Sequence, residues 1–264
     1  MTSIFLNIAG FNLEIKLHKT EHMHYKTKMK ILLIRNFRNF QVYPKPEKTD
    51  YEINFIDRYL HGGFTVKHKN KFFINFFDKQ NGKRIRTFYS ISLYQFQIIL
   101  RKILLELLTK YNGFYLHASA NVVGDAIYIF TGQSQAGKST ISRLLHSKFP
   151  SIADDGIYIR KINDSYYGYI LPVIEKSVLI TKSTKKFPVK KVFFLNKSKA
   201  FKVIPEYNTE FIKEKLVKQI VTDNQFMKKN MLSLFEFIGN FRDFYNIYFA
   251  KDKGATIKLI GDCL

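Results

Sequence analysis

The chain has 264 residues, of which 46% are hydrophobic and 16% aromatic, enough for one large core or two smaller ones. This composition excludes an intrinsically disordered protein. No apolar run approaches the roughly 18 to 20 residues that a membrane-spanning helix needs. The formal net charge of +22 would suit an acidic partner such as nucleic acid, anionic lipid or an acidic protein. The lysines are spread along the chain, however, as a biased base composition can impose, so both origins of the charge stay open.

The number of cysteines indicates whether the protein works in an oxidising or a reducing compartment of the cell. The single cysteine, Cys263, has no partner for an intramolecular disulfide. This fits a reducing cytoplasm. The first ten residues, MTSIFLNIAG, show neither the basic start nor the long apolar segment of a signal peptide. We therefore expect a cytoplasmic protein without a membrane span.

Residues 1–90 alternate between short β segments and turns. Strands are expected at 3–10, 11–17, 30–37, 51–56, 63–70 and 71–77. Asn81 and Gly82 lie between apolar runs, which is a hairpin signal. These features predict a small, mostly antiparallel β domain over residues 1–91, a candidate for presenting the substrate.

The hydrophobic spacing becomes helical from residue 92. Apolar side chains recur three or four positions apart at Phe96, Leu100, Ile103, Leu104, Leu107 and Tyr111. Gly113 is placed to end this helix. The domain boundary is therefore expected near Ser92, with a second domain over residues 92–264.

The second domain mixes strands and helices. Strands are expected at 114–120, 126–130, 156–162, 166–171, 190–196, 244–250 and 255–260. Helices are expected at 138–149, where Pro150 would end the helix, and at 210–221 and 225–238.

Residues 130–140 read FTGQSQAGKST, which contains the pattern G-x-x-x-x-G-K-S between an apolar strand and an amphipathic helix. In such a loop, successive backbone N–H groups and the helix N-terminus can hold phosphate. Gly132 and Gly137 allow the backbone to approach closely. Lys138 can reach the β- and γ-phosphates, and the Ser139 hydroxyl can join Mg²⁺ coordination. The sequence thus predicts ATP and Mg²⁺ as cofactors.

Two adjacent carboxylates, Asp154 and Asp155, follow the expected loop helix in the segment SIADDGIYI. The chain length lets this strand return beside the loop strand, which would place the pair at the strand end facing the phosphates. One carboxylate could hold Mg²⁺ while the other accepts the proton of an attacking hydroxyl. A solvated Asp-Asp-Gly turn is the alternative. His117, in YLHASA, is either a core histidine or a partner that tunes one aspartate.

His117, the loop and the aspartate pair follow one another within residues 113–162. Together they resemble the kinase domain of the HPr kinase/phosphorylase family, which belongs to a P-loop group that includes the phosphoenolpyruvate carboxykinases. The resemblance implies an α/β (α+β) fold, a P-loop domain with a mixed sheet preceded by the small β domain. It also implies kinase activity, since relatives with LHAS before the loop phosphorylate free serine or a serine of a precursor peptide.

The resemblance implies a role for each matching residue. Lys138 would bind phosphate, Asp155 would be the catalytic base, and Asp154 and His117 would support the base and the metal site. Ser139 and Asp154 would hold Mg²⁺. The nucleotide would bind along the whole loop, at Gly132, Gln133, Ser134, Gln135, Ala136, Gly137, Lys138, Ser139 and Thr140. This sequence departs from the family in two places: Gln135 replaces a common glycine, and only Glu175 is a candidate for a further metal-binding glutamate.

The sequence predicts an ATP- and Mg²⁺-dependent kinase that phosphorylates a serine or threonine hydroxyl of a peptide or protein. An acidic acceptor would suit the positive charge of the chain. HPr itself is not the expected acceptor, and a homo-oligomer is compatible with the sequence. One alternative is a kinase of a small hydroxylated metabolite such as free serine. Another is a nucleotide-binding module whose basic surface binds nucleic acid. The aspartate pair favours a kinase, because a binding module has no need of a base.

Overall fold

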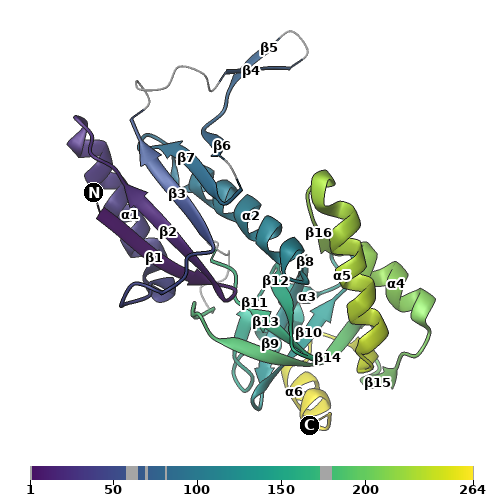
Figure 1. The fold of residues 1–264 in the computed structure, drawn as a ribbon. Coiled ribbons are helices and arrows are strands. Elements are labelled where there is room, and N and C mark those ends of the chain that lie inside the picture. The colour runs from purple at the N-terminus through teal and green to yellow at the C-terminus, as the bar shows by residue number, and fades with distance from the viewer. Residues whose placement is uncertain (1, 58–64, 69–70, 81, 173–179, 264) are drawn as a thin grey trace. The chain divides into compact units, whose positions relative to one another are not determined.

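The computed structural model describes residues 2–57, 65–68, 71–80, 82–172 and 180–263 (Figure 1). The chain forms two compact units, Met1–Leu104 and Leu105–Leu264. Helix α2 (Leu93–Lys110) belongs to both units, so the division falls inside this helix. The expected domain boundary before residue 92 stays a prediction, as does a substrate-presenting role for the first domain. Within the described ranges, no helix has the length and apolar content to cross a membrane.

The first unit is built on a mixed five-stranded sheet in the order β1 (Thr2–Ile8), β2 (Phe11–Leu17), β3 (Tyr51–Ile56), β7 (Arg84–Phe88) and β6 (Phe77–Gln80). The outer pairs β1–β2 and β6–β7 are antiparallel, but β2–β3 and β3–β7 are parallel. The sheet is therefore mixed, with parallel pairing at its centre that the expectation of a mostly antiparallel domain did not include. Strands β4 (Thr65–His68) and β5 (Lys71–Ile74) form a separate antiparallel pair. The pairing of β6 with β7 confirms the hairpin expected around Gly82, and Asn81 lies outside the described residues.

Helix α1 (Met23–Phe37), followed by the short 3-10 helix η1 (Arg38–Phe40), replaces the strand expected at 30–37. The run KILLIRNF is apolar enough for a helix or a strand. The buried residues Met29, Leu33 and Phe37 are four positions apart, which is the spacing of one face of a helix. A parallel connection from β2 to β3 also needs a crossover segment, which α1 supplies.

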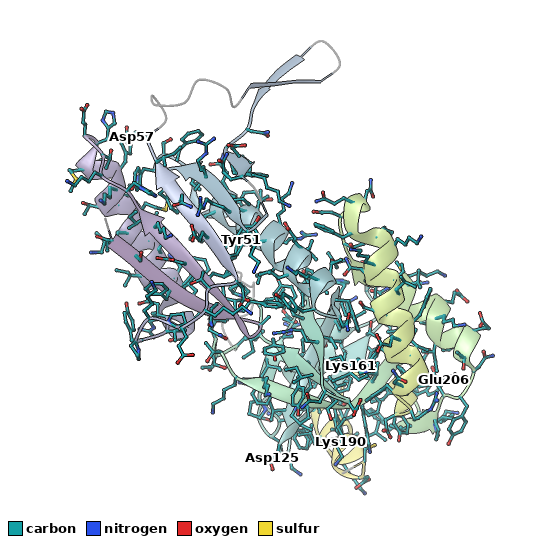
Figure 2. All side chains as sticks on the ribbon, viewed as in Figure 1. Tyr51, Asp57, Asp125, Lys161, Lys190 and Glu206 are labelled. Atoms are coloured by element: carbon teal, nitrogen blue, oxygen red, sulfur yellow. The ribbon has the colours of Figure 1, made fainter. Side chains whose placement is uncertain are left out.

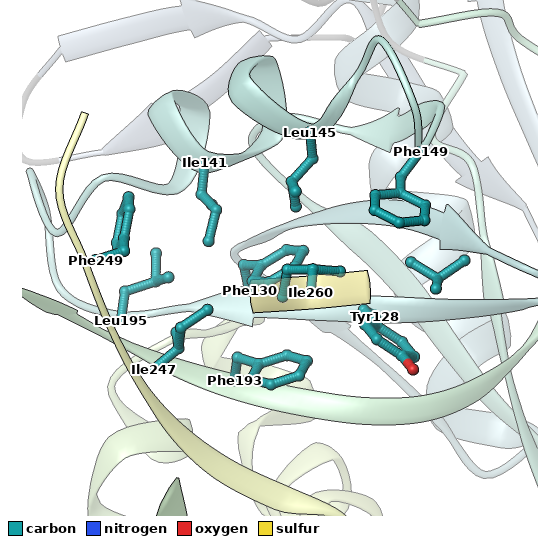
Figure 3. Packing of buried hydrophobic residues seen from close by; sticks show 11 residues of the cluster. Tyr128, Phe130, Ile141, Leu145, Phe149, Phe193, Leu195, Ile247, Phe249 and Ile260 are labelled. Atoms are coloured by element: carbon teal, nitrogen blue, oxygen red, sulfur yellow. The ribbon is translucent and has the colours of Figure 1, made fainter. Parts of the chain in front are cut away.

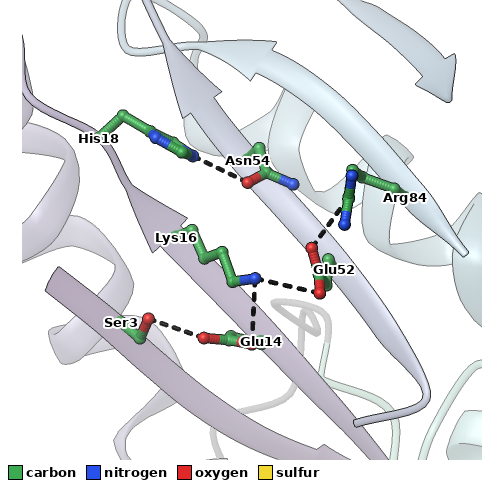
Figure 4. Close-up of polar contacts among 7 residues, drawn as sticks. All are labelled: Ser3, Glu14, Lys16, His18, Glu52, Asn54 and Arg84. Atoms are coloured by element: carbon green, nitrogen blue, oxygen red, sulfur yellow. Dashed lines mark hydrogen bonds and ion pairs between the residues drawn. The ribbon is translucent and has the colours of Figure 1, made fainter. Parts of the chain in front are cut away.

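The two faces of the first sheet differ in polarity. Ile4, Ile15, Ile53 and Ile85 lie in one cross-strand row and are all buried. The other face carries a chain of polar contacts, in which Lys16 lies 3.0 Å from Glu52 and 3.5 Å from Glu14, and Arg84 lies 2.9 Å from Glu52 (Figure 4). Burial acts to raise the pKa of Glu52, but Lys16 and Arg84 outweigh it, and the pKa lies below its usual value.

The second unit contains a ten-stranded mixed sheet, which confirms the expected mixture of α and β structure. Eight strands follow the order β11 (Ser151–Ala153), β9 (Ala118–Val123), β10 (Ala126–Thr131), β14 (Lys186–Lys197), β13 (Ser165–Tyr169), β12 (Ile157–Ile162), β8 (Gly113–Leu116) and β16 (Ile220–Val221). Strand β17 (Phe244–Phe249) pairs with β14 and with β15 (Lys202–Pro205). Because β14 runs parallel to both β10 and β17, these three strands end at the same edge.

Besides the end of α2, the described residues of this unit form the helices α3 (Lys138–Leu145), α4 (Thr209–Val217), α5 (Met227–Asn240), which follows the 3-10 helix η3 (Asn224–Phe226), and α6 (Lys253–Gly261). Ile141 and Leu145 of α3 and Ile260 of α6 join buried side chains of β10, β14 and β17 in one cluster (Figure 3). Within it the rings of Phe130 and Phe193 stack at 5.3 Å. Each such side chain contributes about 1.5 to 3 kcal/mol when fully buried.

Helix α5 packs through Phe237, whose ring lies 5.5 Å from that of Phe114 on β8 and 4.8 Å from that of Tyr166 on β13. At the surface, Lys161 of β12 pairs with Glu236 of α5 at 2.8 Å (Figure 2 labels Lys161). The aromatic contacts explain why α5 is amphipathic in sequence. They fix α5 over the strands that lead to the candidate site.

Three helices after residue 137 differ from the sequence expectations. The segment 255–260 is part of α6, because the side chain of Asp252 accepts from Ala255 N at 2.8 Å and caps a helix. Residues 220–221 form β16, so α4 ends at Val217. Helix α3 ends at Leu145, several residues before Pro150.

The expected helix over residues 92–111 is confirmed as α2, but Gly113 does not terminate it. Asn112 adopts the left-handed conformation there, with φ of 51°, and Gly113 begins β8. A Cβ at Gly113 would lie 2.8 Å from Ile159 O and 2.8 Å from Leu108 Cδ2. The glycine is therefore required by close packing against β12.

Replacing this glycine tests that packing. Gly113→Ala should destabilise the protein by about 1 to 3 kcal/mol, because a backbone oxygen must move to admit the methyl group. Gly239→Ala in α5 is the matched control, since its Cβ would meet no heavy atom within 4 Å and alanine favours the helix by up to about 1 kcal/mol. Chemical denaturation followed by circular dichroism measures both, and equal effects would contradict the packing argument.

Candidate functional site

The loop between β10 and α3 has the backbone geometry that its glycines allow. Gly137 precedes α3 with a left-handed φ of 109°, and Gln135 is also left-handed, with φ of 64°. A Cβ at Gly132 would lie 2.9 Å from the Ala136 Cβ, and one at Gly137 would lie 3.0 Å from the Phe249 ring. Both glycines are thus needed on steric grounds. The loop side chains of Gln133, Ser134 and Gln135 are exposed.

Lys138 folds back over this loop. Its side chain is 7% exposed, and its Nζ donates to Gly132 O at 2.8 Å and to Gln133 O at 3.2 Å. Burial lowers the pKa of Lys138, and the negative charge of Asp155 opposes this effect. A buried cation with two carbonyl partners gains from a bound anion, because the anion offsets its lost hydration.

Buried polar side chains of β9 tie the loop helix to the sheet. Ser119 Oγ donates to Lys138 O at 3.0 Å, and Asn121 Nδ2 donates to Phe149 O at 2.8 Å and to Ser142 O at 3.2 Å. Sequence reasoning missed both residues. Their spacing of two in the strand ASANVV was the available signal, because it puts them on one face of β9. Ser119 thereby holds the start of α3 and with it the position of Lys138, while Asn121 holds the later part of the helix and the segment after it.

His117 lies at the point where the expected strand 114–120 divides. Residues before it belong to β8, which pairs with β12 and β16, and residues after it belong to β9, which pairs with β10 and β11. Its backbone N–H donates to Gln219 O at 2.8 Å. A break in the strand is unexpected from the sequence, since YLHASA has no glycine or proline. The break leaves the imidazole about one third exposed, at 34%, so it is no core residue.

The imidazole meets the second aspartate. His117 Nδ1 lies 2.6 Å from Asp155 O and 3.3 Å from Asp155 Oδ1, while the carboxylate remains 82% exposed. The structure therefore brings together two of the residues singled out in the sequence. The hydrogen bond of the ring goes to the main-chain oxygen of Asp155, and the exposed carboxylate beside it is able to accept a proton from a group arriving from solvent.

The strand before the aspartates does not return beside the loop strand. Strand β9 lies between β11 and β10, which corrects that expectation. Because β9 is antiparallel to both neighbours, β11 and β10 still run the same way and end at one edge. Asp154 and the loop therefore emerge at this same edge of the sheet, with His117 at the start of β9 between them.

The candidate metal ligands are oxygen donors. Ser139 is exposed on the first turn of α3, and Asp154 is partly buried after β11. Among the described ranges no group of three or more His, Cys, Asp or Glu side chains could hold a metal ion. A hydroxyl with one carboxylate suits Mg²⁺, which keeps several waters and takes its remaining ligands from substrate phosphates. Glu175, the further candidate, lies outside the described residues.

Two clefts open beside the loop, both on the side of β14. One, of about 600 Å³, is lined by residues 132–136 with Asn196, Asn246, Tyr248 and side chains of α4. The other, of about 400 Å³, lies at the first turn of α3 and the ends of β14 and β17. It is lined by Gly137, Thr140, Lys197, Ser198, Lys199, Phe249, Ala250 and Lys251. The loop thus has open space on the side away from His117.

No protein-family model matches the sequence, and no curated protein is significantly similar to it. Among solved structures, the HPr(Ser) kinase/phosphatase from Coxiella burnetii is 12% identical, with 56% of this chain and 95% of that chain covered and a TM-score of 0.32. A TM-score this low carries no weight for fold or activity.

The left-handed Gln135 offers a test of the loop conformation. Gln135→Gly should leave stability unchanged or raise it by up to about 1 kcal/mol, because glycine adopts positive φ without a Cβ penalty. Gln135→Val should lower stability, since a β-branched residue at this φ is strained. Gln133→Gly is the control and should only destabilise. Thermal unfolding of the three variants distinguishes these outcomes, and a stabilising valine would refute the conformation.

Proposed function

We propose that the protein is an ATP- and Mg²⁺-dependent kinase that phosphorylates a serine or threonine hydroxyl of a peptide or protein. The observation that carries the proposal is the arrangement of charge at one sheet edge. A buried lysine closes a glycine loop at a helix N-terminus, and the His117–Asp155 pair lies at the same edge. The first feature suits a phosphate group, and the second suits a proton acceptor.

The donor phosphates would lie along the loop, where the backbone N–H groups and the start of α3 supply positive potential. Lys138 would exchange its contacts with the Gly132 and Gln133 carbonyls for β- and γ-phosphate oxygens. When bound, Mg²⁺ neutralises charge that develops on these oxygens. Ser139 and Asp154 would hold the ion. Their positions on the first turn of α3 and after β11 put both at the loop edge.

Asp155 would act on the acceptor. Its carboxylate takes the proton as the acceptor oxygen forms a bond to the γ-phosphorus, and the bond from that phosphorus to the β-phosphate oxygen breaks to release ADP. His117 would position Asp155 through the contact of its Nδ1 with the main-chain oxygen, which places the ring 3.3 Å from the carboxylate. Most of the rate gain would come from positioning and charge neutralisation.

The contact between His117 and Asp155 favours a kinase over a module that only binds nucleotide, since binding requires no oriented carboxylate. A small hydroxylated acceptor such as free serine would use the same groups. Testing a serine peptide library and free serine side by side separates the two classes of acceptor.

Lys138→Ala should abolish transfer and weaken ATP binding by at least about tenfold. The described loop holds no other lysine that reaches the β- and γ-phosphate oxygens. Titration calorimetry with ATP and transfer of labelled phosphate to the peptide library measure the two effects. Lys148→Ala, beyond the end of α3, is the control and should behave as wild type. Unchanged turnover of Lys138→Ala would remove the loop from the mechanism.

The two aspartates should respond differently to amide substitution. Asp155→Asn keeps the shape but removes the base, so transfer should fall by about a hundredfold or more while ATP·Mg²⁺ binding survives. Asp154→Asn should lower metal affinity, so excess Mg²⁺ should partly restore its rate. His117→Ala should shift the pH dependence of turnover, because the ring holds Asp155.

Mg²⁺ titrations and pH profiles of these three variants with one acceptor check the assignments. Rescue of Asp155→Asn by Mg²⁺ would show that the roles are exchanged. Wild-type behaviour of all three would mean that Asp154 and Asp155 form only a turn. The nucleotide-binding module would then be the better description, and a salt-dependent affinity for nucleic acid would support it.

A further inference from the structure

The exposed apolar side chains of the first unit gather at one place. The large ones on α1 and in the segment that follows it are Met23, Tyr25, Ile31, Ile34 and Tyr43. Elsewhere in the described part of this unit, only Tyr94 and Ile98 of α2 are comparably exposed. Single exposed apolar residues are normal on a protein surface, whereas a group of them marks an interaction site.

Helix α1 turns one face to the core and the other to solvent. On the core side, the ring of Phe37 packs against that of Phe96 in α2, with centroids 5.5 Å apart. On the opposite side, Ile31 is 59% exposed and Ile34 is 40% exposed. An isoleucine in contact with water gains free energy when it enters an apolar phase. The exposed face therefore favours a partner that offers such a phase.

The same surface is basic. Residues 22–46 contain no aspartate or glutamate, and their six lysines and arginines are Lys26, Lys28, Lys30, Arg35, Arg38 and Lys45. Lys28, Arg35 and Arg38 are exposed and lie three or four positions from the two isoleucines, on the same helix face. Within the ranges that the structure describes, none of these three makes an ion pair with an acidic side chain. Their charges are thus available to an external anion.

A tyrosine extends this face beyond the end of the helix. Tyr43 is 75% exposed, and its hydroxyl donates to Gln41 Oε1 at 3.0 Å. Gln41 Nε2 in turn donates to Ile34 O at 3.1 Å, which holds the segment against the last turn of α1. We refer to these exposed residues together as the α1 surface: Lys28, Ile31, Ile34, Arg35, Arg38 and Tyr43.

We propose that the α1 surface docks the protein on an anionic lipid bilayer. Ile31 and Ile34 enter the boundary between headgroups and acyl chains, and the lysine and arginine side chains contact acidic headgroups. Tyrosine suits this boundary, because its ring is apolar and its hydroxyl is polar. The inference is independent of the proposed kinase activity, since it uses only residues of the first unit.

The mixture of apolar and basic side chains favours a bilayer over other acidic partners. Nucleic acid would pair with the cations, but its charged backbone offers no apolar phase to exposed isoleucines. An acidic protein would need a groove shaped to the protruding side chains, whereas acyl chains adapt to them. Lysine and arginine can also leave their aliphatic stems in the apolar boundary while their charges reach the headgroups.

The first test measures the role of charge, by sedimentation of the full chain with vesicles. Binding to phosphatidylcholine vesicles that contain about 30% phosphatidylserine should be at least about tenfold tighter than binding to phosphatidylcholine alone. Lys28→Glu/Arg35→Glu should weaken binding to the anionic vesicles by at least about tenfold. Lys228→Glu/Lys229→Glu, on exposed positions of α5, changes the net charge equally and should weaken binding by less than about threefold.

The second test measures the role of the isoleucines. The chain contains no tryptophan, so Ile31→Trp introduces a single reporter. Its fluorescence should shift to shorter wavelength when anionic vesicles are added, and brominated lipid should quench it. Leu232→Trp in α5 is the matched control, since Leu232 is 60% exposed and Ile31 59%, and its emission should stay unchanged. Ile31→Ser should weaken vesicle binding by about threefold to tenfold, and Leu232→Ser by less than about twofold.

Equal losses in the charge variants of α1 and α5 would show that net charge alone attracts the protein to vesicles, and would overturn the docking surface. Equal affinity for the two kinds of vesicle, or no binding to the anionic ones, would also overturn it. An unshifted Ile31→Trp emission in vesicle-bound protein would leave only electrostatic attraction, as expected for a nucleic-acid surface. The substituted side chains are exposed, so circular dichroism should show every variant folded as the wild type.

Discussion

The site depends on one interaction, the burial of the Lys138 ammonium against two carbonyl oxygens of its own loop. A cation removed from water is costly unless its partners replace the lost hydration, and two neutral carbonyls do so only in part. The left-handed Gly137, the packing of Gly132 on Ala136, and the hydrogen bond from Ser119 to Lys138 O all hold the backbone in the shape that makes this burial possible. An incoming phosphate would find the positive charge already in place.

The break at His117 is the second constraint. The chain changes its strand partners at this residue. The backbone N–H of His117 donates to Gln219 O, and its imidazole contacts Asp155. Strands β8 and β9 lie in one ten-stranded sheet but have different neighbours, and His117 between them reaches the turn after β11. The irregularity therefore creates the histidine–carboxylate contact.

Much of the loop and its strand–loop–helix setting could be predicted from the sequence, because the required glycines, lysine and serine are adjacent in the chain. The helix α2 was predictable for a similar reason, since its apolar spacing is long and regular. Short segments were harder. The run KILLIRNF has no alternation of apolar and polar residues that would distinguish a helix from a strand. The segment ATIKLI was expected to be a strand because the helix cap at Asp252, three residues before it, was not considered. The parallel pairings in the first sheet, and the place of β9 between β11 and β10, depend on contacts between distant segments that no local pattern records.

The late pairing of strand β14 with β17 affects the chain while it is being synthesised. Its early residues pair with β13 and β10, but the edge formed by residues 192–197 is completed only by β17, about fifty residues later. Until Phe249 has left the ribosome, the run Val192, Phe193, Phe194 and Leu195 lacks its final neighbour, and an unpaired apolar edge can join other chains. Contacts this distant in sequence also slow folding. Synthesis of this protein thus passes through a stage in which an apolar strand of its second sheet is open to aggregation, so a chaperone that covers this strand would protect the growing chain.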